Sequence, residues 1–255
     1  MTAAHSHHLT GNDFRPVARA LTIVENDLKG AGQILKSLDF KKHVPVIGIT
    51  GPPGAGKSTL VNDIIAELTE KGNKVAVLAI DPTSPFNFGS LLGDRIRMAS
   101  HFNHPGVFIR SLATRGSLGG LSAKTIEMTD VLRASGFDYV IIETVGVGQS
   151  EIEIAGLAGL TLVVLVPEGG DEIQSIKSGL MEIADAFIVN KADREGADLF
   201  ANNLKKMVQQ KHDSTPVFKT VASENQGIKE IIDFIASNGS KKKQPQGISF
   251  GRKGL

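Results

Sequence analysis

A glycine-rich turn followed by lysine and serine is the part of this sequence whose residue types and spacing best suit chemistry. It spans residues 51–58 and reads Gly-Pro-Pro-Gly-Ala-Gly-Lys-Ser. Its glycines allow backbone conformations that a Cβ would forbid, so successive N–H groups can turn inward and form a nest for an anion. The Lys57 ammonium can reach the β- and γ-phosphates of a nucleotide, and the Ser58 hydroxyl can bind magnesium. The expected phosphate-binding residues are Gly54, Ala55, Gly56, Lys57, Ser58 and Thr59.

We call residues 51–58 the phosphate loop, and it needs a strand before it and a helix after it. Residues 44–50 are short, apolar and β-branched, which predicts a buried strand. After Lys57, apolar residues recur at helical spacing, which predicts a helix. The positive end of the helix dipole would then add to the amides of the loop. A chance glycine turn is the alternative, and this context argues against it.

A second motif, residues 190–193, reads Asn-Lys-Ala-Asp and follows an apolar stretch. The Asp193 carboxylate can accept hydrogen bonds from N1 and the exocyclic amine of guanine, whereas adenine offers the wrong donor pattern. The Lys191 stem can cover the base, Asn190 can brace neighbouring loops, and the amides of Ala222-Ser223 can meet the guanine oxygen. This pattern favours GTP over ATP. The alternative is a polar helix start that Asp193 only caps.

Three carboxylates, those of Asp81, Asp94 and Glu143, are candidates for metal binding and hydrolysis, because each lies near a predicted strand end or in a glycine-rich stretch. Magnesium prefers oxygen ligands and keeps several waters. We therefore expect Ser58 to bind it directly and some carboxylates to act through water. The alternative for each carboxylate is a helix cap or a surface ion pair.

Gly146, three residues after Glu143, can offer its N–H to the γ-phosphate. Many GTPases place a water-positioning glutamine directly after this glycine, whereas Val147 stands there in this chain and Gln149 comes later. The sequence therefore does not identify the residue that orients water. It predicts slow intrinsic turnover that a partner accelerates.

Composition narrows the class of protein. The 255 residues are 41% hydrophobic, with a net charge of +1 and no cysteine. The length suits one α/β domain with extensions. Absence of cysteine excludes disulfides and thiolate chemistry, and it fits a reducing cytoplasm. The small net charge and the lack of an apolar run of about 18 residues predict neither a nucleic-acid partner nor a membrane partner.

Predicted strands and helices alternate along the chain, which favours an α/β fold of the P-loop NTPase kind, a mostly parallel sheet with helices on both faces. The predicted strands are residues 44–50, 75–80, 107–112, 137–143, 162–166, 186–189 and 217–221. The predicted helices after the phosphate loop include residues 121–134, 152–160, 173–183, 197–210 and 228–235.

Three regions are expected on this basis. Residues 1–43 form an N-terminal tail and a helical appendage, whose helix over 14–40 breaks near residues 30–32. Residues 44–237 form the P-loop GTPase domain. Residues 238–255 form a basic, flexible C-terminal tail.

Five blocks resemble the methylmalonyl-CoA mutase-associated GTPases, and the resemblance extends over about residues 15–235. The blocks are residues 48–59, 81–85, 93–98, 143–150 and 190–193. The resemblance implies a metallochaperone GTPase that uses GTP/GDP and magnesium and guards a cobalamin-dependent acyl-CoA mutase. Such proteins gate the delivery of adenosylcobalamin from an adenosyltransferase and help to exchange damaged cofactor.

The resemblance also assigns roles to residues. It implies that phosphate, magnesium and hydrolysis functions fall on Lys57, Ser58, Asp81, Asp94 and Glu143. It implies a third mobile switch at residues 170–182, including Asp171, Glu172, Gln174 and Lys177, for which an ordinary amphipathic helix is the alternative.

The resemblance bears on assembly as well. Family members commonly continue into a helical extension used for dimerisation, whereas this chain ends soon after Ile235. We therefore do not expect dimerisation by that route, and a homodimer through the GTPase faces stays open.

Two rival functions share the phosphate loop. A small-molecule kinase would use it for transfer to a hydroxyl, but that function gives no role to Asn190 or Asp193. A nickel-delivery GTPase for a hydrogenase or urease would need a cysteine pair or an internal histidine cluster, and the sequence offers neither.

Overall fold

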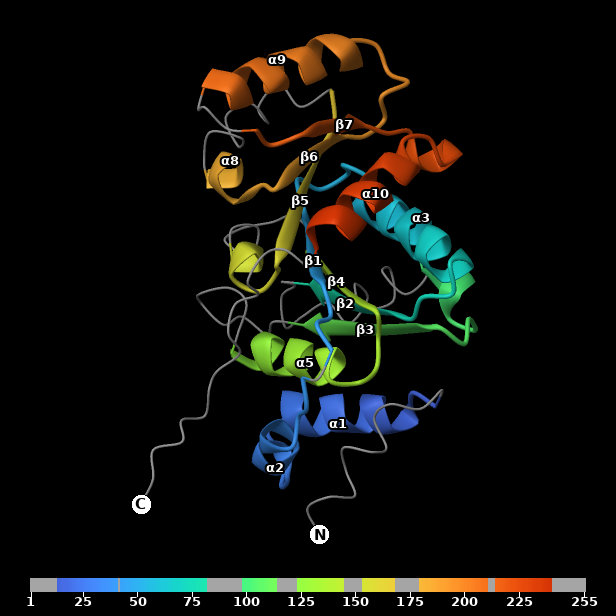
Figure 1. Cartoon of the computed structure of the whole chain (residues 1–255), viewed down its shortest axis with the longest axis vertical. Coiled ribbons are helices and arrows are strands. Elements are labelled where there is room, and N and C mark those ends of the chain that lie inside the picture. Colours follow the sequence, from blue (N-terminus) through green and yellow to red (C-terminus); the bar gives the residue numbers. More distant parts are fainter. Residues whose placement is uncertain are drawn as a thin grey trace.

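The computed structural model describes residues 13–40, 42–81, 98–113, 123–144, 153–167, 179–210 and 214–239. In this part of the chain a central sheet lies between layers of helices (Figure 1). The strands are β1 (Val46–Thr50), β2 (Val75–Asp81), β3 (Val107–Ala113), β4 (Tyr139–Thr144), β5 (Leu160–Leu165), β6 (Ala186–Val189) and β7 (Val217–Lys219). The α-helices are α1 (Arg15–Glu25), α2 (Ala31–Lys36), α3 (Lys57–Glu70), α5 (Ala123–Arg133), α8 (Met181–Ile183), α9 (Ala197–Gln210) and α10 (Ile228–Asn238).

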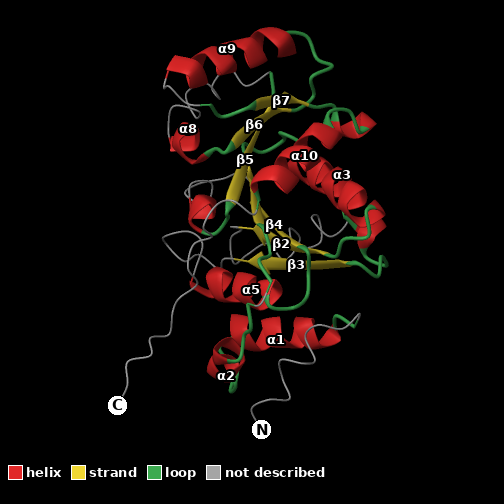
Figure 2. Ribbon diagram, viewed as in Figure 1, coloured by secondary structure: helices red, strands yellow, loops and turns green. Residues whose placement is uncertain are grey.

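The seven strands form one parallel sheet in the order β3-β2-β4-β1-β5-β6-β7. From β1 the chain runs outward to β2 and β3, returns to β4 beside β1, and continues on the other side with β5. Strand order therefore reverses around β1, and ligands of such sheets bind beyond the carboxyl ends of the strands at that point. The predicted P-loop α/β architecture is confirmed (Figure 2).

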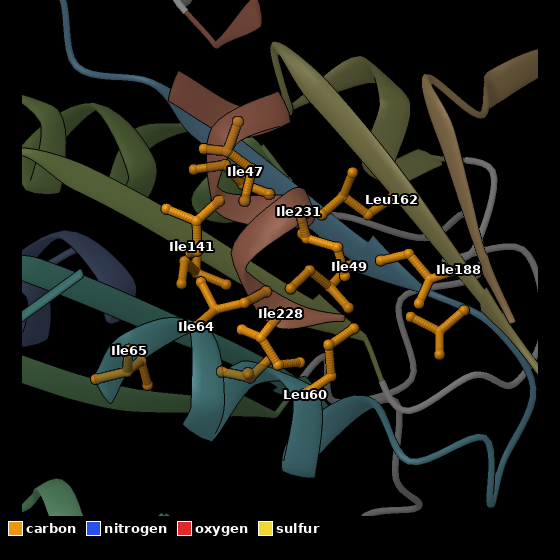
Figure 3. Packing of buried hydrophobic residues seen from close by; sticks show 14 of the residues in the cluster. Ile47, Ile49, Leu60, Ile64, Ile65, Ile141, Leu162, Ile188, Ile228 and Ile231 are labelled. Atoms are coloured by element: carbon orange, nitrogen blue, oxygen red, sulfur yellow. The ribbon is translucent and has the colours of Figure 1, made fainter. Parts of the chain in front are cut away.

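One face of the sheet is covered by α3 and α10. Because side chains alternate along a strand, Ile47 and Ile49 of β1 point to this face and pack against Ile64 of α3 and Ile231 of α10 (Figure 3). The central strands are buried on both faces, which explains why their sequences are mostly apolar and do not alternate with charged residues. This core holds the N-terminus of α3 close to the carboxyl end of β1.

The opposite face is covered by two groups of helices. Helices α1, α2 and α5 share a hydrophobic cluster with β2, β3 and β4, in which Leu21 and Val24 of α1 are fully buried. Helices α8 and α9 cover β5 and β6. An ion pair between Arg110 of β3 and Glu25 adds a polar link from α1 to the sheet.

Two predicted helices differ from the structure. The predicted helix over residues 152–160 is wrong in its second half: of the described residues 153–160, residue 153 is α-helical and the short 3₁₀ helix η2 (Ile154–Gly156) follows it, but the helix does not continue to residue 160. Leu160 instead extends β5 by pairing with Ile47, and strand pairing thus outweighs the helical spacing of the apolar residues. The predicted helix over 14–40 breaks at residues 26–30, slightly earlier than expected, because Gly30 caps α2 with a φ of 104°.

Other predicted features lie partly or wholly outside the residues that the structure describes. Residues 179–183 are the described part of the predicted helix 173–183 and end in α8, and α10 continues to Asn238, one residue past the expected domain end. The loops at 82–93 and 114–120 and the tail from residue 240 lie outside the described residues. Within the described ranges, every helix is too short or too polar to cross a bilayer.

Candidate functional site

The phosphate loop joins the end of β1 to the start of α3, and its shape depends on glycine at two places. Gly51 has a φ of 139°, and a Cβ there would lie 2.0 Å from the carbonyl oxygen of Val164 in β5. Gly56 has a φ of 86°, and a Cβ there would lie 2.3 Å from the Asn190 side-chain nitrogen. Both the backbone angle and the lack of space therefore require glycine.

Lys57 is buried at the first turn of α3, and the phosphate loop folds around its ammonium. Its Nζ donates hydrogen bonds to the carbonyl oxygens of Gly51 at 2.7 Å and Pro52 at 2.8 Å. These bonds hold a positive charge at the N-terminus of the helix, where the dipole is also positive. Two sources of positive potential thus meet at the same point of the cavity described below.

Ser58 and Glu143 bring two oxygen ligands together from different elements. The Ser58 hydroxyl of α3 donates to Glu143 Oε1 at 2.6 Å, and Glu143 is a buried residue of β4. A hydroxyl beside a carboxylate suits a hard cation such as magnesium. The residues present therefore fit the predicted metal, although no three His, Cys, Asp or Glu side chains gather at one metal position within the described residues.

The other predicted residues near the γ-phosphate are only partly placed. Asp81 ends β2, next to β4, and its side chain lies outside the described part of the chain. Asp94 and Gly146 lie outside the described residues, as do the four residues named in the predicted third switch. Their roles stay predictions.

Asn190 ties the phosphate loop to the last βα loop. It is 2% exposed, and its Nδ2 donates to the carbonyl oxygen of Ala55 at 2.9 Å. Its Oδ1 accepts from the Thr220 hydroxyl at 3.1 Å and from the Ala222 amide at 3.2 Å. One buried side chain therefore holds three segments in register, which is the bracing role that the sequence suggests.

Lys191 lies over the phosphate loop. Its Nζ donates to the Gly54 carbonyl oxygen at 2.8 Å, and its backbone has a φ of 55°, which is unusual for a residue other than glycine. Asp193, two residues later, has an exposed side chain. The Ala222 amide donates to Asn190 and Ser223 is exposed, so the predicted contact of these two amides with the guanine oxygen stays a prediction.

A cavity of about 430 Å³ lies against these groups, a size that suits a small-molecule ligand. The residues that line it are Pro53, Gly54, Gly56, Lys57, Ser58, Thr59, Ala79, Ile80, Glu143 and Lys191. It thus joins the predicted phosphate, metal and base-covering residues in one space. The cavity lining does not include Asn190, Asp193, Ala222 or Ser223. Asn190 instead contacts the phosphate loop through its hydrogen bond to Ala55.

Sequence reasoning missed several residues at this site. Ala79 and Ile80 line the cavity from the end of β2, and their position at a strand end next to the predicted Asp81 was the available signal. Thr220 was missed as a partner of Asn190. The contact between Thr50 and Thr144 was also missed, because no short-range pattern pairs residues 94 positions apart.

Comparisons with known proteins agree with this geometry. The family model described as methylmalonyl-CoA mutase-associated GTPase MeaB matches residues 17–247. A Pyrococcus abyssi protein, named provisionally as a GTPase, is 51% identical over 231 residues, which are 88% of this chain and 71% of that protein. The mouse protein named methylmalonic aciduria type A homolog is 42% identical over 169 residues, which are 66% of this chain and 39% of that protein.

A solved structure shares the fold. The crystal structure named as an LAO/AO transport system kinase matches with a TM-score of 0.73 and 28% identity, and the match covers 92% of this chain and 74% of that one.

Proposed function

The chain belongs to the methylmalonyl-CoA mutase-associated GTPase family and is a GTP hydrolase, and on this premise we propose that its hydrolysis times the loading and protection of a cobalamin-dependent acyl-CoA mutase. The family match over residues 17–247 is the observation that carries the proposal, because it includes every described residue of the nucleotide site. A chain without cysteine also suits the reducing cytoplasm that we propose as its location.

The proposed site residues divide the work of binding and hydrolysis. Loop amides and the Lys57 ammonium bind the β- and γ-phosphates. During hydrolysis a water oxygen bonds to the γ-phosphorus while the bond to the β–γ bridging oxygen breaks, giving GDP and inorganic phosphate. Lys57 and the loop amides stabilise the negative charge of the transition state.

Magnesium is the proposed metal. Ser58 and Glu143 would hold it, with Asp81 and Asp94 as further ligands suggested by the sequence. When bound, it supplies positive charge that neutralises phosphate oxygens. The Ser58 hydroxyl and the Glu143 carboxylate are already in contact at 2.6 Å, so their oxygens face the same space.

Asp193 is the proposed reader of the guanine base, and its substitution tests the base side of the site. We expect Asp193→Asn to lower the preference for GTP and to improve binding of xanthosine nucleotides, because the new amide can donate to the extra ring oxygen. Fluorescent nucleotide titrations with GTP, XTP and ATP measure the change. Exposed Glu195→Gln, two residues away, is the matched control. Unchanged guanine preference in Asp193→Asn would remove the base-reading role.

The rival functions are weaker. The structural relative's name calls that protein a kinase, but a kinase gives no role to the base-side motif that Asn190 and Lys191 connect to the phosphate loop. Phosphate released from GTP without any added acceptor separates hydrolysis from kinase activity. The sequence contains no cysteine for a nickel-delivery site.

The mutase partner can be tested by association. We expect the purified chain to bind a cobalamin-dependent acyl-CoA mutase, such as methylmalonyl-CoA mutase, with an affinity that differs between GDP and a slowly hydrolysed GTP analogue. Equal affinity in both nucleotide states would contradict a timing role. The adenosyltransferase as cofactor donor and a homodimer through the nucleotide faces belong to this proposal on the family resemblance alone.

A further inference from the structure

Two threonines form a buried hydroxyl pair at the edge of the nucleotide site. Thr50 is the last residue of β1 and Thr144 is the last residue of β4. Both residues are 0% exposed, and the Thr144 hydroxyl donates to the Thr50 hydroxyl at 3.0 Å. Neither residue lines the cavity, yet each directly adjoins a residue or loop of the site.

The pair lies where the sheet opens to form the site. The register of β1 with β4 ends with Ile49 opposite Glu143, one residue before the threonines. Beyond this point the chain after β1 enters the phosphate loop. The hydroxyl contact is therefore a side-chain link one step past the last paired residues.

Two side-chain hydrogen bonds hold the end of β4, one on each face of the sheet. On the face covered by α3, Ser58 donates to Glu143. Side chains alternate along a strand, so Thr144 and Thr50 point to the other face, where Gly48 lies against Ile154. A strand end fixed on both faces cannot rotate easily, and Glu143 is the residue whose carboxylate such a rotation would displace.

Stability alone does not explain a hydroxyl pair at this place. Burial of two hydroxyls costs desolvation, and a single neutral hydrogen bond returns little net free energy. Two valines would fill the same volume without that cost. The hydrogen bond does fix the rotamers of both threonines relative to each other, which valines would not do through a directional contact.

We propose that Thr50 and Thr144 are positioning residues that keep the Glu143 carboxylate aligned with Ser58 and thereby set kcat for GTP hydrolysis. This inference rests on the proposed role of Glu143 in hydrolysis. The threonines act through Glu143 and do not touch the nucleotide.

Variants that remove one or both hydroxyls test the proposal. We expect Thr144→Val to lower kcat roughly tenfold, because small displacements of a reacting group are costly, while KM for GTP changes less than about twofold. Thr144→Ser keeps the hydroxyl and should retain most of kcat. Thr50→Val/Thr144→Val leaves no unpaired hydroxyl, so its unfolding midpoint should return toward wild type while kcat stays low.

Thr129→Val is the matched control. Thr129 is buried in α5, and its hydroxyl donates to the Thr125 carbonyl oxygen at 2.7 Å. Its loss should lower the unfolding midpoint and leave kcat unchanged. If Thr144→Val does not fold, Thr50→Val and Thr144→Ser provide the same comparison.

Glu143→Gln distinguishes the proposed role of Glu143 in hydrolysis from the proposed positioning role of the two threonines. Loss of kcat in Glu143→Gln together with normal kcat in the double valine variant would overturn the positioning role alone. Normal kcat in Glu143→Gln would overturn the proposed role of Glu143 itself. Loss of kcat in both, with KM preserved, supports both.

Discussion

At the scale of single residues, the site is held by contacts that connect its parts before any ligand is considered. Lys57 binds two carbonyl oxygens of its own loop, and Asn190 binds that loop and two residues of the loop between β7 and α10. Each contact is short and mostly buried. Preorganisation of this kind reduces the conformational entropy that the loop must otherwise lose when a nucleotide binds.

Lys57→Ala is the simplest test at this scale. We expect GDP and GTP affinity to fall by on the order of 100-fold, since charge-assisted hydrogen bonds to phosphate are lost and the loop loses the ammonium that it surrounds. Titration with a fluorescent GDP analogue measures the change. Lys71→Ala removes an exposed lysine at the other end of the same helix and should bind normally. Unchanged affinity in Lys57→Ala would mean that the loop is not a phosphate site.

The sequence predicts some of the site's residues but not the long-range contacts that their side chains make. The phosphate loop could be recognised because glycine is required where φ is positive, as at Gly51 and Gly56. The bracing role of Asn190 could be expected from its motif, whereas its partners Thr220 and Ala55 could not be identified. Contacts such as Thr50 with Thr144 depend on which strands become neighbours, and strand order is not encoded in local spacing.

At the scale of elements, α3 and α1 show how helices anchor the site to the sheet. Helix α3 packs with α10 over β1, and it carries Lys57 and Ser58 at its N-terminus. Helix α1 packs on the other face and contributes to the cluster around β2 and β4. The strands that end at the cavity are thus supported from both sides.

Leu21→Ala tests whether α1 and the sheet unfold together. Leu21 is fully buried, so its truncation should cost about 2–5 kcal/mol. At about 2–4 °C per kcal/mol for a chain of this size, the unfolding midpoint should fall by roughly 4–20 °C in one transition. Differential scanning calorimetry measures it, with half-exposed Leu28→Ala as the control. A separate early transition would show instead that the N-terminal helices unfold as an independent appendage.

Asp63 on α3 gives a pH-dependent prediction. Burial raises the pKa of its carboxyl to about 6, and its Oδ2 has no hydrogen-bond partner in the described structure. The folded chain therefore holds the proton more tightly than the unfolded chain. Stability from this group is present at low pH and is lost as pH rises from about 4 to 6.

The matching experiment compares Asp63→Asn with wild type at two pH values. At pH 8 the neutral amide should stabilise the fold by about 1 kcal/mol, a discounted figure because the carboxyl keeps part of its contact with water. At pH 4.5 the advantage should largely vanish. Urea unfolding at both pH values measures it, with Glu67→Gln on the same helix as the control. An equal advantage at both values would exclude ionisation as the cause.

At the scale of the whole molecule, the strand order determines where the chemistry is placed. The reversal around β1 brings the phosphate loop, the end of β4 and the loop after β6 to one edge of the sheet. Alternation of strands and helices predicted this architecture, because buried parallel strands have a strong apolar signal. Residues 152–160 were harder to predict, because a short apolar stretch fits a helix or a strand until its neighbours are known.

The proposed timing role is tested by GTP turnover of the purified chain, measured alone and with a cobalamin-dependent acyl-CoA mutase. Phosphate release from GTP should be slow for the chain alone, because Val147 and not a glutamine directly follows Gly146. It should rise at least about tenfold with methylmalonyl-CoA mutase, and Lys57→Ala should abolish it under both conditions. Fast turnover by the chain alone that methylmalonyl-CoA mutase leaves unchanged would contradict a GTPase that times the loading of the mutase.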